Sequence, residues 1–278
     1  MSSDNPDDYS SSSSSEVSSS SSSSENSCSS VTFLDSLSAN IPVEVMNVIN
    51  SKFQISGNMR ISDWVSVRGT LWAGSRVEIG VDAEVLDEIV SGGDVALANR
   101  SKVGRVRLAG NLQTQQGAQY GEIVVDNGLS VAPLPQISFA TGTSDIMVGR
   151  EQSTTVSPGT YRNLIAHEKA KLQFAAGDYY FDSFWIDPHV EFEFAAGTRV
   201  WIANGFNVAA FCQVTHGGGA GDLFVYIGAN GYVSIGNNVQ MQAVIYAPRA
   251  SVQVFDHTTL EGAVWAKDLN VEPYSVLK

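Results

Sequence analysis

The sequence predicts an all-β solenoid, in which short strands wind into coils and each coil stacks on the one before. The first observation is a repeat: residues 245–247 return as 264–266 after 19 residues, and 170–177 returns as 190–197 after 20 residues. The second is that apolar and polar residues alternate inside these segments, which gives each strand one buried and one exposed face. A single unit of this length cannot bury its own apolar face, so a run of such units is typical of stacked coils.

The first 30 residues differ from the rest of the chain in composition. They contain 18 serines and five acidic residues, and no Lys or Arg. Because such a segment has almost no apolar surface to offset its chain entropy, residues 1–30 are predicted to form a disordered, extended linker. We therefore expect the chain to be part of a larger modular protein. Residues 31–278 are expected to form a single β-solenoid domain, which is long enough to bury a substantial core.

Two short helices are expected to flank the coils. In the first, residues 42–49, Pro42 suits the first helical turn and apolar residues follow at helical spacing. In the second, residues 82–90, Asp82 is the expected N-cap. The strand alternation begins at Phe53 and uses glycines as corners.

Residues 127–160 interrupt the strand pattern, because prolines and glycines cluster there with little alternation between them. We expect a long crossover or a loop excursion at this point, between two sections of one solenoid. Beyond it the pattern is clear again, and Val190, Phe192 and Phe194 must share one buried face.

Composition argues against several partners. The net charge of -13 would repel phosphate backbones, so nucleic acid is a poor partner. No apolar run reaches about 18 residues, which predicts no membrane span, and no signal-peptide pattern opens the chain. Cys28 lies in the serine-rich segment and Cys212 in the body. We predict that Cys212 is a small buried residue rather than a disulfide partner.

Four short motifs together resemble a known family. They are Ser157-Pro-Gly-Thr-Tyr161, Phe174-Ala-Ala-Gly-Asp-Tyr-Tyr-Phe181, Ile245-Tyr-Ala-Pro-Arg-Ala250 and Gly262-Ala-Val-Trp-Ala-Lys267. In that order they resemble the choice-of-anchor A type of domain found in bacterial surface adhesins, over roughly residues 50–278.

The resemblance implies a right-handed parallel β-helix, an extracellular or cell-surface location, and an adhesive or scaffolding role. The Pro-Gly-Thr-Tyr turn and the closing coils are also similar to those of bacterial ice-binding β-helix domains. Poly-serine linkers resemble those that join modules in secreted bacterial proteins that degrade plant polysaccharides.

Four aromatic residues form a candidate binding surface. If their neighbours in each strand face the interior, Trp72, Trp201, Tyr246 and Trp265 must point outward. Exposed flat aromatics stack on sugar rings, so an outward row of them predicts an interaction surface. The alternative is that one of the two expected helices covers them.

Four acidic residues form a second candidate site. Alternation points Asp178 and Asp182 outward, and Glu191 and Glu193 outward on what we expect to be the next coil. Carboxylates on one strip could hold calcium, or could act as general acid and base in glycosidic cleavage. The alternative is a solvated acidic face, since only Arg199 is close enough in sequence to serve a lyase as a base.

The leading hypothesis is a non-catalytic extracellular binding or adhesion module that associates with polysaccharide or cell-surface material. The alternative is a β-helix polysaccharide lyase or glycoside hydrolase that uses the outward carboxylates. Ice binding and a structural filament former are lower-ranked hypotheses. We expect a binding module rather than an enzyme, because the sequence contains no recognisable catalytic constellation.

Overall fold

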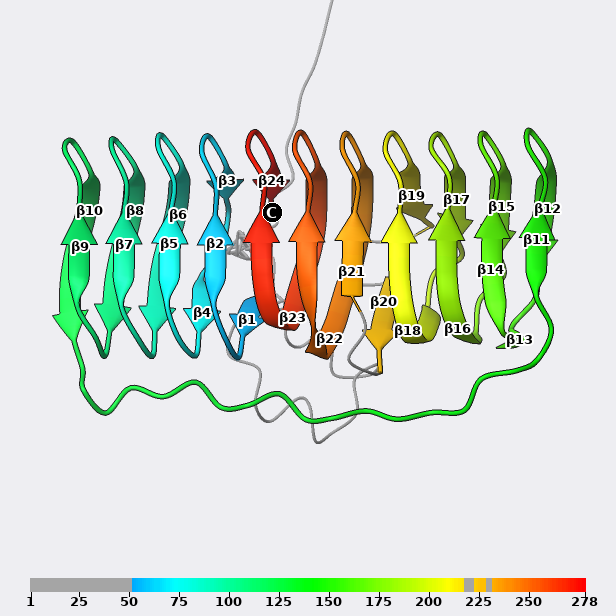
Figure 1. The fold of residues 1–278 in the computed structure, drawn as a ribbon, viewed down its shortest axis with the longest axis horizontal. Coiled ribbons are helices and arrows are strands. Elements are labelled where there is room, and N and C mark those ends of the chain that lie inside the picture. Colours follow the sequence, from blue (N-terminus) through cyan, green and yellow to red (C-terminus); the bar gives the residue numbers. More distant parts are fainter. Residues whose placement is uncertain (1–51, 218–222, 229–231) are drawn as a thin grey trace, which may run out of the picture.

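The computed structural model describes residues 52–217, 223–228 and 232–278. Within these ranges the protein is all-β and contains no helix. The strands form a β-solenoid of about 11 turns (Figure 1). The predicted fold class is thereby confirmed at the level of a solenoid. The serine-rich segment, Cys28 and the helix expected at 42–49 lie outside the described residues.

Each coil passes over three faces in the order A, B, C. Face A contains β1 (Phe53–Ile55), β4 (Leu71–Ala73), β13 (Gly159–Thr160) and β20 (Leu223–Ile227). Face B contains β2 (Met59–Ile61), β5 (Val77–Ile79), β7 (Val95–Leu97), β9 (Leu112–Thr114), β11 (Ile146–Val148), β14 (Asn163–Ala166) and β21 (Tyr232–Ile235). Face C contains β3 (Ser66–Val67), β12 (Ser153–Val156), β15 (Lys171–Phe174), β17 (Glu191–Phe194), β19 (Gln213–His216) and β24 (Val276–Leu277). The longer strands turn corners onto further faces: β6 (Glu84–Ser91), β8 (Lys102–Leu108), β10 (Gln119–Val125), β16 (Asp178–Ile186), β18 (Thr198–Val208), β22 (Gln240–Val254) and β23 (Thr259–Val271).

The coils do not follow one another in sequence order (Figure 1). The N-terminal half starts in the middle of the solenoid and winds outward to β9 and β10. The chain between β10 and β11, residues 126–145, then runs back along the whole length to the opposite end. We call this segment the crossover. The interruption expected at 127–160 is therefore a crossover, and it is shorter than expected because β11, β12 and β13 already lie within that range.

The C-terminal half returns to the middle and closes against the start of the chain. Strand β23 pairs in parallel with β1 and β2, and β24 pairs with β3. We call this junction the seam. Its register, for example Phe53 opposite Val264, continues the parallel ladder, so the two halves share one uninterrupted stack of coils.

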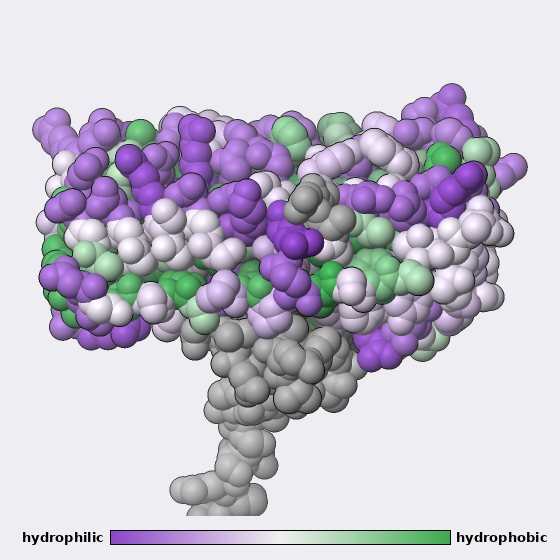
Figure 2. Space-filling model, turned by 60° about the horizontal axis from the view of Figure 1, so that its bottom comes forward, coloured by the Kyte–Doolittle hydropathy of each residue, from purple (hydrophilic) through white to green (hydrophobic). Residues whose placement is uncertain are grey.

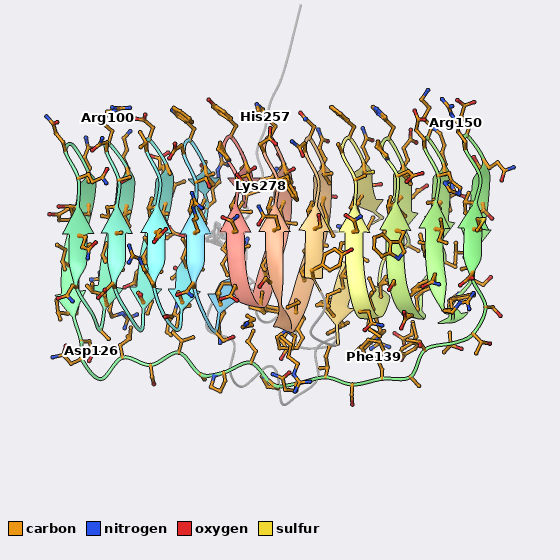
Figure 3. All side chains as sticks on the ribbon, in the orientation of Figure 1. Arg100, Asp126, Phe139, Arg150, His257 and Lys278 are labelled. Carbon is orange, nitrogen blue, oxygen red and sulfur yellow. The ribbon has the colours of Figure 1, made fainter. Side chains whose placement is uncertain are left out.

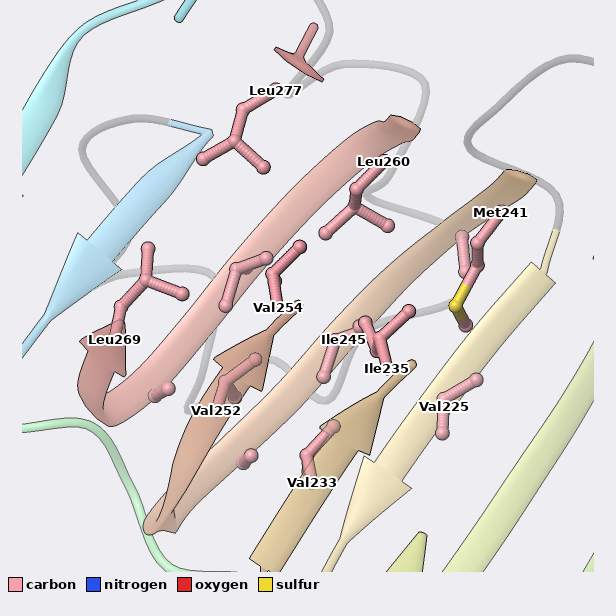
Figure 4. Close-up of a cluster of buried hydrophobic side chains, with 14 of the residues drawn as sticks. Val225, Val233, Ile235, Met241, Ile245, Val252, Val254, Leu260, Leu269 and Leu277 are labelled. Atoms are coloured by element: carbon pink, nitrogen blue, oxygen red, sulfur yellow. The ribbon is translucent and has the colours of Figure 1, made fainter. Parts of the chain in front are cut away.

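The core is a set of columns in which equivalent side chains stack from coil to coil, at a spacing of about 4.8 Å. Phe192 and Phe194 lie inside, in register with Leu172 and Phe174, as alternation predicts. The rings of Phe174 and Phe194 stack with centroids 4.4 Å apart. Near the seam the columns are aliphatic (Figure 4). Cys212 is buried in this core with a free thiol, as predicted.

The helix expected at 82–90 is wrong, because residues 84–91 form β6. This strand pairs with β3 and β4 on one side and with β8 on the other. A bulge between Val85 and Glu88 breaks the two-residue alternation and imitates helical spacing. Asp82 is not an N-cap; it is a corner residue with a positive φ of 56°.

Each coil turns from face B to face C through one residue in the left-handed conformation, with φ between 55° and 62° at the non-glycine positions. A non-glycine residue is strained there. The backbone N–H of this residue donates to a carbonyl of a neighbouring coil, as Tyr274 does to Asp63 (3.3 Å). Figure 3 shows His257 and Arg100 on the loops along this edge. These residues, the corner row, are Trp64, Asp82, Arg100, Glu151, Lys169, His189, Phe211, Asn238, His257 and Tyr274.

Candidate functional site

An aromatic row runs along face A, one residue per coil. Tyr246 and Trp265, two of the predicted binding residues, are neighbours in it. Their side chains leave the coil interior and pack in a cluster separate from the main core. They point outward as predicted, but of the two alternatives the rings are covered and not exposed, because Tyr246 is 1% and Trp265 0% exposed. In register order the row is Tyr180, Trp201, Tyr226, Tyr246 and Trp265, continued across the seam by Gln54 and Trp72.

The crossover covers this row. Leu134 is buried in the same cluster as Tyr246 and Trp265. The Tyr246 hydroxyl donates to the carbonyl of Pro135, and the Gln54 amide donates to the carbonyl of Ala132 (3.3 Å). Figure 2, in which this side of the molecule comes forward, shows surface hydrophobic residues in a broken line between hydrophilic ones. In the described part of the chain the cover is thus an extended crossover and not a helix.

Trp201 and Trp72 also have internal partners. The indole of Trp201 stacks on Tyr226 with centroids 4.0 Å apart, and Phe139 of the crossover meets it edge-on at 5.6 Å. Figure 3 shows where Phe139 lies on the crossover. The half-buried Trp72 faces the guanidinium of Arg107, whose central carbon is 5.8 Å from the ring centroid. The four predicted aromatics therefore contribute to internal packing.

The four predicted acidic residues do not form one strip. Asp178 and Asp182 belong to β16, which pairs with β13, β14 and β18. Glu191 and Glu193 belong to β17, which pairs with β15 and β19 on face C. The expectation failed because β17 lies in the same coil as β16, one corner further on, and not in the next coil.

Each of these carboxylates has a partner of its own. Asp178 accepts two hydrogen bonds from the guanidinium of Arg199, and Asp182 accepts one from the Asn204 amide (2.6 Å). The ammonium of Lys171 lies 2.8 Å from Glu191. The amide of Gln173 donates to Glu193 (3.1 Å). In the described ranges no three His, Cys, Asp or Glu side chains come together as a metal ion would require.

The shifted pKa values do not identify a catalytic group. Burial raises the pKa of the Cys212 thiol to about 11, which keeps it protonated and poorly nucleophilic at neutral pH. Burial also raises the pKa of Tyr226 and of Tyr246, and the crossover cluster around both explains it. The pKa of Asp145 falls to about 2 because the Arg162 guanidinium donates to it. These shifts reflect packing and surface ion pairs.

Face B carries two exposed aromatics that the sequence analysis did not single out. Trp185 is 45% and Tyr232 46% exposed, and their ring centroids lie 6.4 Å apart at 64°. Between their coils lies Gly205, the register partner of Tyr232. A Cβ at Gly205 would meet the Tyr232 ring at an ordinary van der Waals distance of 3.5 Å, so that ring lies directly over the Gly205 strand.

The alternation of β16 explains why Trp185 was missed. Counting by twos from the buried Phe181 would place Trp185 inside. However, Ser183 and Phe184 are both buried, because the chain turns from face A to face B there and the alternation restarts. The short pattern Phe184-Trp185-Ile186 on its own would have given the correct orientation.

Two hollows, of about 490 and 520 Å³, lie on face B across the seam. Both are lined by Arg60, Arg76 and Glu78 from the N-terminal half. The C-terminal half contributes Glu272 to the first hollow, and Gln253 and Asn270 to the second.

The polar groups in the hollows are partly committed to one another. The Asn270 amide donates to Gln253 (2.8 Å) and the Gln253 amide to Glu272 (2.8 Å). Arg76 and Glu78 form an ion pair at 2.9 Å. The exposed Arg60 makes no ion pair with any described residue.

No helix in the described part of the chain is long and apolar enough to cross a membrane. Residues 196–276 match a family model described as a domain of unknown function, DUF7305. The match spans β18 to β23 and so includes the C-terminal side of the seam. No curated protein and no solved structure matches the chain.

Proposed function

We propose that this protein is a non-catalytic extracellular binding module that associates with polysaccharide, or with other cell-surface material rich in sugars, through face B. The observation that carries the proposal is the exposed pair Trp185 and Tyr232 beside a polar, hollowed surface. Aromatic rings that expose their faces bury the apolar faces of sugar rings, and neighbouring amides and guanidinium groups bond the hydroxyls.

The location outside the cell and the adhesive role rest on the motifs and on the serine-rich segment. A right-handed winding of the coils belongs to the same proposal, since parallel crossover connections are almost always right-handed. A catalytic role has less support, because the outward carboxylates Asp178, Asp182, Glu191 and Glu193 lie on separate strands and bond to different partners.

Insoluble-polymer pull-down of the full chain tests the proposal, with cellulose, xylan, mannan and chitin as probes. We expect retention on at least one polymer and loss of retention in the double variant Trp185→Ala/Tyr232→Ala. The matched control is Phe211→Ala, which removes a comparably exposed aromatic (51%) from the corner row. Absence of binding to every polymer, or equal loss in the control, would overturn the proposal. New reducing ends or unsaturated products in the supernatant would favour an enzyme instead.

End-to-end assembly is a second candidate function. At the β10 end, Tyr120, Ile123 and Val125 are 40%, 39% and 62% exposed. Their register partners in β8 are buried, so these three side chains belong to interior columns that have no further coil to cover them. An uncovered coil end offers apolar surface and unpaired backbone groups to a second copy. Sedimentation velocity tests it: we expect association that Val125→Lys abolishes, and a concentration-independent monomer would exclude it.

A further inference from the structure

Trp185 and the two hollows of face B lie along one row of register partners, and Tyr232 lies in the column beside it. Trp185 lies in an outward row that has one residue per coil, starts at Met147 and Ile165, and ends at Gln113. The row crosses the seam between Asn270 and Arg60, which are register partners. From Trp185 onward it is Trp185, Asn207, Ser234, Gln253, Asn270, Arg60, Glu78, Ala96 and Gln113.

The length of this row suits a polymer. Eight coil-to-coil steps separate Trp185 from Gln113, which at about 4.8 Å per step gives a length of about 38 Å. A pyranose unit in an extended chain advances by nearly the same distance as one coil. Successive sugars would therefore meet successive side chains of the row without bending.

The two hollows beside the row have the direction that a polymer chain along the solenoid axis would need. The first hollow extends along the axis from Glu272, through Arg60 and Glu78, to Gln113. The second extends from Ser251 through Asn270 to Glu78, on the other side of the same row. Both hollows thus run across the coils and include residues from both sides of the seam.

The charges around the hollows select the chemistry of the ligand. The hollows are lined by two guanidinium groups, those of Arg60 and Arg76, and by four carboxylates. Arg76 is already paired with one of the carboxylates, Glu78. A polyanion such as a polyuronate would meet an excess of negative charge. A neutral chain of hydroxyl groups can instead accept from Arg60 and bond to the amides at little electrostatic cost. The four carboxylates are Asp63, Glu78, Asp268 and Glu272.

We propose that one extended, neutral polysaccharide chain binds along face B, parallel to the solenoid axis. Its sugars stack on Trp185 and Tyr232 at one end, and hydrogen-bond to Gln253, Asn270 and Arg60 where the row crosses the seam. This inference rests on the proposed function and adds its ligand class, its direction and the residues that contribute beyond the aromatics. Because the site includes residues from both halves of the chain, a bound ligand also stabilises the seam between them.

Calorimetric titration with soluble oligosaccharides tests the axial site, using the series from dimer to octamer of the polymer retained in the pull-down. We expect affinity to rise with chain length through the series. Arg60→Ala should weaken octamer binding about 10- to 150-fold, the loss expected for one hydrogen bond to a charged group, and should leave dimer binding unchanged. Trp185→Ala should weaken both. The matched control is Arg68→Ala, an exposed arginine that does not line either hollow.

Thermal unfolding supplies a second readout that does not depend on the fit of a binding curve. The octamer should raise the Tm of the full chain more than an equal mass of dimer, because only the longer ligand spans the seam. Arg60→Gln serves as a second variant that stays polar and loses the charge, and its Tm without ligand should equal that of the parent chain.

The outcomes separate the two proposals. Polymer retention that depends on Trp185, together with octamer affinity equal in Arg60→Ala and the parent, leaves the proposed function standing and overturns the axial site. Affinity that does not change with length overturns it as well, and so does tighter binding of polygalacturonate or alginate than of any neutral polymer. Loss of all polymer binding overturns both proposals.

Discussion

The indole of Trp64 lies flat against the phenol of Tyr274, with ring centroids 5.0 Å apart and ring planes 1° from parallel. The two residues come from opposite ends of the described chain, and His257 extends the stack on the far side of Tyr274 at 4.9 Å. The rings sit in the corner row where the first coil of the chain meets the last. The seam is therefore held by an external aromatic stack in addition to the strand pairing.

Trp64→Ala should weaken the seam. We expect a loss of about 1 kcal/mol in the free energy of unfolding, the usual value of an aromatic pair. Amide hydrogen exchange in β3 and β24 should accelerate, because these two short strands pair with each other across the junction beside the stack. Phe211→Ala breaks a similar stack with His189 (5.0 Å), far from the seam in register. Equal acceleration of β24 exchange in both variants would contradict this role.

Leu134→Ala should loosen the crossover. Leu134 is 3% exposed and packs in the cluster with Tyr246 and Trp265, so its truncation should cost about 3 kcal/mol in urea unfolding. Water should then approach the buried indole, and tryptophan emission should shift to the red. Ser138→Ala, at an exposed crossover position, is the control and should change neither quantity. An unchanged urea midpoint in Leu134→Ala would show that the crossover does not stabilise the fold.

Acid should remove the contribution of Asp145 to the free energy of unfolding. Its carboxyl accepts from the Arg162 guanidinium and from the backbone and amide of Asn163, which lowers its pKa from 3.8 to about 2. Because the pKa is lower in the folded state than in the unfolded state, the stabilisation is fully present above pH 3.8 and is lost as the pH falls toward 2. Asp145→Asn should be less stable than the parent near neutral pH. The difference should shrink as the solution is acidified, and a constant difference would count against this linkage.

Cys212 should resist alkylation in the folded protein. Burial raises its pKa to about 11, and its side chain is fully buried. In a Cys28→Ser background, we expect iodoacetamide to modify Cys212 only after urea is added, as mass spectrometry would show. Rapid modification without urea would mean that the coil opens locally around this residue.

Alternation and repeat length together were enough to predict the solenoid and much of its core. The paired phrases at 170–177 and 190–197 correctly placed Phe192 and Phe194 inside, because the strand period requires it. Bulges and corners caused the failures. The bulge in β6 imitated a helix, and the restart of alternation in β16 hid Trp185.

The covering of the aromatic row depends on contacts between distant parts of the chain. Tyr246 and its partner Pro135 are separated by 111 positions. The crossover has no periodic pattern from which its position against the coils could be predicted. Alternation could determine that Tyr246 and Trp265 leave the interior, but not what they meet there. The order of the coils could not be predicted either. Every coil has a similar pattern of apolar residues, so the sequence of one coil does not indicate which other coil it pairs with.

The crossover also limits how long such a solenoid can become. Its 20 residues between β10 and β11 reach at most about 66–72 Å when extended. Spanning about 11 turns requires roughly 48 Å. Each added coil would lengthen the stack by about 4.8 Å and so use about 1.5 residues of the remaining slack. A chain that gained coils at either end would leave the seam untouched, and would have to lengthen its crossover once that slack was used. The crossover that covers the aromatic row thus also sets the maximum length of the solenoid.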